Sequence, residues 1–163
     1  MLENEPFKKL PLAYIPNSKR NHYPPMFLFG FAIPNHVPEF RRAALKYELG
    51  DPEKLNAPDS EFLLRKLVMG HLNGRCGLQP GKDVTCEYIR SRESNLLLEV
   101  ANNYNMKIPE DKFEDVLRCI REVFSLPEDA PPKWYLWTNF RKDPDAYRLP
   151  SESSASMRNW RII

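Results

Sequence analysis

Residues 26–34 read MFLFGFAIP, and the interpretation of the whole chain starts from this stretch. Seven consecutive apolar or glycine residues, Met26 to Ala32, are followed by Ile33, with proline on both sides of the run. Flanking prolines interrupt helical hydrogen bonding, and the aromatic content is typical of a pleated strand. Because the run has no polar alternation, we expect both of its faces to be buried. The stretch therefore predicts the central strand of a sheet, covered by helices or by a partner subunit.

Two helices are predicted after this strand. The first spans residues 38–49, where apolar side chains recur at helical spacing, and Gly50 with Asp51-Pro52 is expected to stop it. The second starts at Asp59 or Ser60 and ends in the glycine-containing segment 71–77. The apolar face of this second helix is predicted to consist of Phe62, Leu63, the stem of Lys66, Leu67, Gly70 and His71.

A hairpin is predicted next. Residues 83–90, DVTCEYIR, alternate between apolar and polar side chains with the period of a half-buried strand. The polar residues 91–94, SRES, fit a turn. We interpret residues 95–104, NLLLEVANNY, as the second strand of the hairpin, although their apolar residues also fit a helix. The fold assignment depends on this choice.

The last two elements are a helix and a strand. Residues 109–129 contain the clearest amphipathic helix of the chain, with acidic residues near its start and arginines toward its end. Residues 133–140, KWYLWTNF, have the aromatic density and length of a final strand. From residue 141 the sequence is polar and then serine-rich, which favours a flexible tail.

The order of these elements is strand, helix, helix, strand, strand, helix, strand. It resembles the ferredoxin-like split βαβ arrangement with the first crossover helix doubled, which implies an α+β fold with an antiparallel four-stranded sheet and helices on one face. The predicted organisation is a proline-rich N-terminal arm (1–25), a single α+β domain (26–140) and a polar C-terminal tail (141–163). The second sheet face would be open unless dimerisation or the arm covers it.

Composition limits the classes of function. The 163 residues carry a formal charge of +2, and basic residues are in excess only in segments 1–25 and 140–163, so the slightly acidic region between them argues against a dedicated nucleic-acid-binding domain. Three cysteines without paired spacing and an N-terminus without a secretory signal favour a reducing, cytoplasmic location. No segment approaches the roughly 18 apolar residues of a membrane helix, which favours a soluble protein without a membrane partner.

Three motifs were weighed as possible cofactor, RNA or metal sites. The loop GRCGLQPGKD (74–83) has Cys76 where a phosphate-binding loop needs its first glycine, and it leads into a strand instead of a helix. The segment 29–32 resembles part of the aromatic strand of RNA-recognition domains, but it lacks the basic lead-in residue. The spacings of His71, Cys76, Cys86 and Cys119 do not form the close pairs of a zinc site. No cofactor and no metal are therefore predicted.

The leading functional hypothesis is a non-enzymatic module that binds a protein partner or assembles with itself, as in a homodimer. It depends on the very apolar first strand and on terminal segments that are rich in proline and aromatic residues and are able to cover a sheet face in another copy.

The alternative hypothesis is a small cofactor-independent enzyme or small-molecule-binding protein that resembles the dimeric α+β barrels, with a pocket between sheet and helices. Its candidate catalytic residues are His36 as the base and Tyr23 or Tyr88 as a hydrogen-bonding partner. Acidic residues near the predicted hairpin, at 87, 93 and 99, are additional candidates for carboxylates that face one another.

Overall fold

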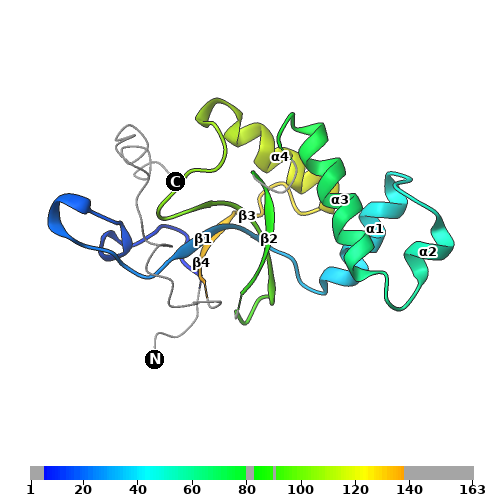
Figure 1. The fold of residues 1–163 in the computed structure, drawn as a ribbon, viewed down its shortest axis with the longest axis horizontal. Helices are drawn as coiled ribbons and strands as arrows, with labels where there is room; N and C mark the ends of the chain where they lie inside the picture. Colours follow the sequence, from blue (N-terminus) through cyan, green and yellow to red (C-terminus); the bar gives the residue numbers. More distant parts are fainter. Residues whose placement is uncertain (1–5, 80–82, 90, 138–163) are drawn as a thin grey trace.

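The chain folds around a four-stranded antiparallel sheet with the strand order β2-β3-β1-β4 (Figure 1). The computed structural model describes residues 6–79, 83–89 and 91–137. The strands are β1 (Phe27–Ala32), β2 (Thr85–Tyr88), β3 (Leu96–Asn102) and β4 (Lys133–Leu136). The MFLFGFAIP segment is a central strand, as predicted, since β1 pairs with β3 on one side and with β4 on the other. Residues 96–102 form a strand and not a helix, and every residue of β3 is buried.

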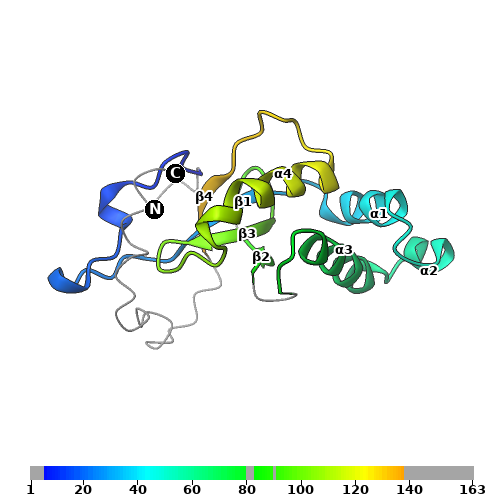
Figure 2. The same ribbon diagram turned by 90° about the horizontal axis from the view of Figure 1, so that it is seen from above.

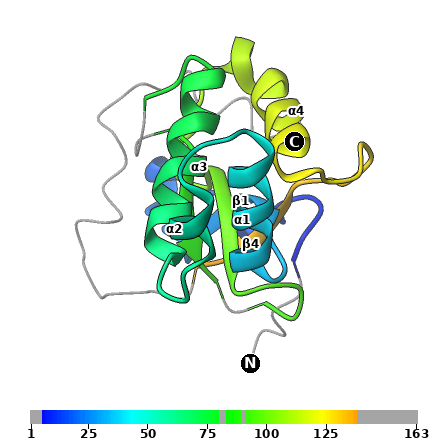
Figure 3. The ribbon, with the colours of Figure 1, turned by 90° about the vertical axis from the view of Figure 1, so that its right-hand side faces the viewer.

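Helices connect the strands and gather at one side of the sheet (Figures 1 and 3). They are α1 (His36–Lys46), α2 (Pro52–Asn56), α3 (Glu61–Arg75) and α4 (Phe113–Phe124). The short helix α2 was not expected, because Asp51-Pro52 was interpreted as a stop. The Asp51 carboxylate instead accepts a hydrogen bond of 3.0 Å from the Glu53 amide, and Pro52 takes the first helical position, so this pair starts a helix.

The main core lies between the sheet and these helices. Alternate residues of β1, namely Phe27, Phe29 and Phe31, point into it together with buried residues of α1, α3 and α4. Basic residues of α1 also close the C-terminal end of α4: Arg42 donates to the Phe124 carbonyl at 2.6 Å and Lys46 to the Glu122 carbonyl at 2.9 Å. Cations at this end stabilise the unpaired carbonyls and the helix dipole.

The predicted apolar face of α3 is correct only in part: Leu63 and Leu67 are partly buried and pack against the main core, but other predicted members are exposed. Phe62 is 79% exposed, and Lys66 and Gly70 are exposed as well. The buried row is Leu64, Val68, Leu72 and Asn73. Leucines occur on adjoining sides of this helix, so spacing alone does not select the fully buried row, and packing against α1 and α4 does.

The second face of the sheet is closed within the chain. Leu28, Ile89, Leu97 and Tyr135 form a second, smaller core there. The turn between β2 and β3 reaches across to β4, where the Glu93 carboxylate accepts hydrogen bonds from Lys133 and from the Tyr135 hydroxyl. A bridge between Ile89 and Trp137 joins opposite edges of the sheet. The burial of both faces of β1 therefore requires no second subunit.

The α+β class, the antiparallel four-stranded sheet and the placement of helices on one side are confirmed. Each crossover passes over one strand, as in a split βαβ unit, but the first one holds three helices, so the closer ferredoxin-like comparison stays a prediction. The division into arm, domain and tail also stays a prediction, and residues 138–163, which include the tail, lie outside the described residues.

Gly30 allows a close approach of β1 to β3. The register between these strands shifts at Phe29/Gly30, and a Cβ atom added at Gly30 would lie 1.9 Å from the Leu98 carbonyl oxygen. We expect Gly30→Ala to lower the free energy of unfolding by about 3 kcal/mol or more, because backbone atoms of both central strands would have to move. Urea unfolding measures this change.

Gly70→Ala is the matched control for this prediction. No described atom lies within 4 Å of a Cβ added at Gly70, so alanine there should raise stability by roughly 0.5–1 kcal/mol through helix propensity. Equal effects of the two substitutions would contradict the assigned role of Gly30.

Candidate functional site

Glu61 brings together two of the three residues that the sequence singled out, His36 and Tyr88. His36 begins α1 and Tyr88 ends β2, while Glu61 begins α3. The Glu61 Oε1 atom lies 3.1 Å from His36 Nε2 and accepts a hydrogen bond of 3.3 Å from the Tyr88 hydroxyl. The His36 side chain is 15% exposed and that of Glu61 41%. A histidine, a carboxylate and a phenol therefore meet at the surface where these three elements end or begin.

Arg65 extends this group and lies over the Tyr88 ring. Its guanidinium carbon is 5.3 Å from the ring centre, and its Nη1 donates to the Tyr88 hydroxyl at 3.1 Å. Tyr88 is 43% exposed, and Phe62, one turn before Arg65 on α3, is 79% exposed. We call Phe62, Arg65 and Tyr88 the α3–β2 surface.

Tyr23 does not belong to this group. It precedes β1, whereas His36 follows it, so the six residues of the strand, about 20 Å in length, separate the two. Tyr23 is 47% exposed. The proposed pairing of His36 with a tyrosine therefore applies to Tyr88 through Glu61, and Tyr23 is left without a role in the site.

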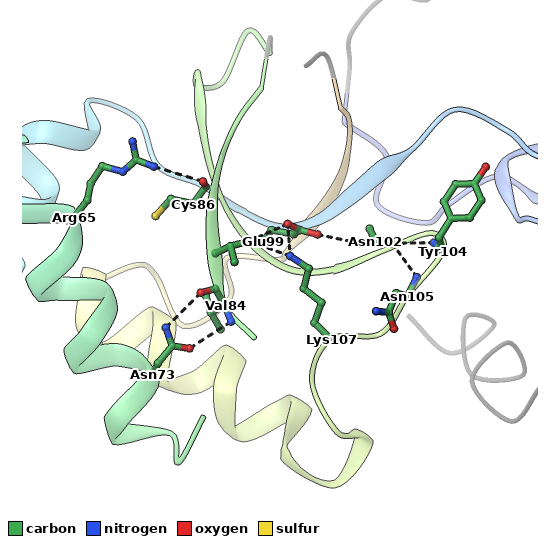
Figure 4. Close-up of polar contacts among 10 residues, drawn as sticks. Arg65, Asn73, Val84, Cys86, Glu99, Asn102, Tyr104, Asn105 and Lys107 are labelled. Carbon is green, nitrogen blue, oxygen red and sulfur yellow. Dashed lines mark hydrogen bonds and ion pairs between the residues drawn. The ribbon is translucent and has the colours of Figure 1, made fainter. Parts of the chain in front are cut away.

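A buried carboxylate, Glu99 of β3, is the centre of a second polar cluster (Figure 4). Glu99 is only 2% exposed. Its Oε2 atom accepts hydrogen bonds from Lys107 Nζ at 2.6 Å and from the Thr85 hydroxyl at 2.9 Å, and its Oε1 atom accepts one from Asn102 Nδ2 at 3.2 Å. Lys107 Nζ also donates to the Thr85 hydroxyl at 3.0 Å. We call these four residues the Glu99 cluster.

The Glu99 cluster ties the segment that follows β3 to the sheet. Asn102 is oriented by its own turn, since its Oδ1 atom accepts hydrogen bonds from the Tyr104 and Asn105 amides at 3.0 and 2.8 Å. A buried charge of this kind needs an ion-pair partner and further donors, and Glu99 has both. The arrangement is that of a structural tie, because the carboxylate is saturated with donors from the chain itself.

The three acidic residues near the hairpin have different environments. Burial, and then the neighbouring Glu99 carboxylate, raise the pKa of Glu87. Burial acts to raise the pKa of Glu93 as well, but hydrogen bonds from Lys133 and Tyr135 outweigh it, and the pKa of Glu93 lies below its usual value. The expectation that carboxylates face one another here therefore applies to Glu87 and Glu99, while Glu93 faces β4.

Side chains of α3 occupy the outer edge of β2 (Figure 4). The buried Asn73 amide donates to the Val84 carbonyl and accepts from the Val84 amide, each at 3.3 Å. Arg65 Nη2 donates to the Cys86 carbonyl at 3.5 Å. On the other side of the sheet, Phe7 exchanges two backbone hydrogen bonds with Trp134 of β4. Both edges of the sheet are thus partly blocked against strand addition.

Within the described ranges, the structure contains no group of three or more His, Cys, Asp or Glu side chains that could hold a metal ion. The three cysteines are free thiols. Burial raises the pKa of Cys76 to about 12 and that of Cys86 to about 11, so both stay protonated and poorly nucleophilic at neutral pH. Residues 80–82 of the glycine-containing loop lie outside the described residues.

Sequence reasoning missed Glu61, Arg65, Phe62 and Lys107 as members of these sites. Glu61 and Arg65 carried no signal beyond helix-compatible charge, and Phe62 was assigned to the core. Among the described helices, none has both the length and the apolar character needed to cross a bilayer. The cytoplasmic location stays a prediction. No family model, no curated protein and no solved structure matches the chain.

The raised pKa of Glu87 gives a pH-dependent prediction. The folded protein holds this proton to a higher pH than the unfolded chain, so stability falls as pH rises from the ordinary value of 4.5 through the raised pKa. We expect Glu87→Gln to remove this fall: the variant should be more stable than the wild type at neutral pH, and the gain should vanish in acid. Thermal unfolding across this pH range measures it.

Glu93→Gln is the control of opposite sign. The pKa of Glu93 in the folded protein lies below its ordinary value of 4.5, so its carboxylate stabilises the fold above pH 4.5 and this contribution is lost as pH falls through the folded-state pKa. The Glu93→Gln variant should therefore be less stable than the wild type at neutral pH, and the difference should vanish in acid. Identical pH profiles of the two variants would contradict the assignment of the two carboxylates.

Proposed function

We propose that this protein is a non-enzymatic module that binds a segment of another polypeptide through the α3–β2 surface. The observation that carries the proposal is the 79% exposure of Phe62 beside an arginine that lies over a second exposed ring. Exposed aromatic side chains next to arginine are the residue types that dominate binding energy at protein interfaces. Phe62 makes no contribution to either core cluster of the fold.

The charge of Arg65 supports a partner that carries a carboxylate. Its two hydrogen bonds go to neutral oxygens, those of Tyr88 and Cys86, and no carboxylate of the described residues forms an ion pair with it. Glu61, the nearest acidic residue along the helix, is engaged by His36 and Tyr88 instead. A guanidinium held in place and still able to pair with an anion favours a segment with an acidic and an apolar side chain.

The blocked sheet edges support recognition by side chains over strand addition. Asn73 and Arg65 donate hydrogen bonds to the backbone carbonyls of Val84 and Cys86. Phe7 exchanges backbone hydrogen bonds with Trp134 at the other edge. A partner strand would have to displace these contacts before it could pair with the sheet. The α3–β2 surface requires no such rearrangement.

Two substitutions test this function. Immobilised full-length protein would be exposed to an extract of the organism that makes it, and the bound proteins would be quantified by mass spectrometry. We expect at least one partner to fall about tenfold on Phe62→Ala and on Arg65→Gln, as for the loss of one interface hot spot. Direct titration of the purified partner would then give the affinities.

Leu45→Ala is the matched control, since Leu45 of α1 is 42% exposed and lies outside the α3–β2 surface. It should retain the partner, and all variants should keep their melting temperatures within a few degrees. A set of bound proteins that is the same on wild type, Phe62→Ala and Arg65→Gln would disprove the proposed surface. Copies of the chain itself among the bound material would identify self-association.

A second candidate function is a small-molecule site or simple acid–base catalysis at His36. The contact of Glu61 Oε1 with both His36 Nε2 and the Tyr88 hydroxyl favours it, because a carboxylate that orients a histidine is a recurrent catalytic arrangement. Native mass spectrometry of protein purified from its own host should then detect a retained ligand. His36→Ala should remove this adduct and leave the melting temperature unchanged, and an adduct retained by His36→Ala would exclude the site.

A further inference from the structure

Residues 15–23 form a connector that projects from the body, between the first part of the chain and β1 (Figures 1 and 2, dark blue). Residues 18–23 are all exposed. The connector folds back on itself: the Asn17 and His22 backbones exchange hydrogen bonds of 2.9 and 3.0 Å, and Asn21 adopts a left-handed conformation with φ of 48°. The contacts that hold this turn are therefore local.

The segment before the connector, residues 6–14, makes contacts of a different kind. Phe7 and Tyr14 pack on Phe27 at the start of β1, with ring centres 5.8 and 4.6 Å from the Phe27 ring. Phe7 also exchanges backbone hydrogen bonds of 2.9 and 2.8 Å with Trp134. Residues 6–14 of the predicted N-terminal arm, to which the word arm refers from here on, thus form an isolated bridge to β4 and cover part of the main core.

Asn103 holds both ends of the connector. This residue is 2% exposed, and its Nδ2 atom donates to the Tyr14 and Pro25 carbonyls at 2.9 Å each, while its Oδ1 atom accepts from the Phe27 amide at 2.8 Å. The body therefore presents a binding site for the arm, which consists of β4, Phe27 and Asn103. Any copy of the arm that reaches this site makes the same contacts.

We infer that the arm is exchangeable. Two copies of the chain pair when residues 6–14 of each bind to this site on the body of the other. Opening the connector loses the Asn17–His22 hydrogen bonds and the contact of His22 Nε2 with the Ala13 carbonyl, whereas the arm regains its contacts with the body on the second copy. The nine residues of the connector span about 30 Å when extended, which is enough to leave one body for another. This inference is independent of the proposed α3–β2 surface.

Prolines in and directly after the connector bias its backbone toward extended conformations. Proline at positions 16, 24 and 25 disfavours the helical region for the residue before it and biases the chain toward extended conformations. The closed turn places Asn21 in the left-handed region, which asparagine tolerates better than most residues but glycine adopts still more readily.

Isotope-filtered NMR tests the exchange directly. Full-length labelled and unlabelled protein would be unfolded together, refolded at high concentration and separated by size. In the dimer fraction we expect nuclear Overhauser effects between the Phe7 ring of one chain and the Phe27 ring of the other. The absence of any dimer, or a dimer in which this contact is found only within one chain, would overturn the inference.

Two variants separate arm exchange from dimers of another kind. Asn21→Gly relieves the left-handed turn in the closed form only, so it should lower the dimer fraction severalfold. Phe7 makes the same contacts in both forms, so Phe7→Ala should leave the dimer fraction unchanged and accelerate subunit exchange about tenfold, as expected for weaker aromatic packing. A dimer fraction that is insensitive to Asn21→Gly, or subunit exchange that is no faster in Phe7→Ala, would contradict the exchange of arms.

Discussion

The approach of β1 to β3 at Gly30 is the contact on which both cores depend. A side chain at this position would collide with the Leu98 carbonyl, and the register shift beside it sets which residues of β1 face the helices. Phe29 and Phe31 consequently enter the main core, while Leu28 faces the smaller core on the second side. An apolar strand without polar alternation is stable here because each face has its own cover within the chain.

Buried polar side chains complete the sheet where its ladders end. The Asn73 side chain forms hydrogen bonds with both backbone groups of Val84 at one edge, as a neighbouring strand would. Asn103 accepts a hydrogen bond from the Phe27 amide at the start of β1, and Glu99 pairs with Lys107 from the segment after β3. Buried backbone and charged groups are costly when unpaired, so these side chains are needed by the fold. Exposed groups that the fold does not need, above all Phe62, are the better candidates for recognition.

His36 was chosen from sequence because it follows the central strand, where a loop is able to present it at a pocket, and Tyr88 was chosen as a hydrogen-bonding partner for it. Their connection through Glu61 was invisible, since the three residues belong to separate elements and meet only when α1, α3 and β2 pack. Tyr23 was chosen on the same grounds, but it lies at the opposite end of β1. The exposure of Phe62 differs from the prediction, because leucines occur on adjoining sides of α3 and the fully buried row is the one with Leu64 and Leu72.

By itself, the sequence determined the order and type of the main elements. Proline boundaries, apolar runs and helical or alternating spacing are local properties, so β1, β2, β4 and the three longer helices were predictable, while residues 95–104 fitted a helix as well as the strand β3. The tertiary structure alone decided which side of α3 is buried, how the hairpin bends over the second sheet face, and which polar groups meet. These features depend on contacts between residues far apart in the chain, such as Glu93 with Tyr135 and Glu99 with Lys107, and no local pattern encodes such distances.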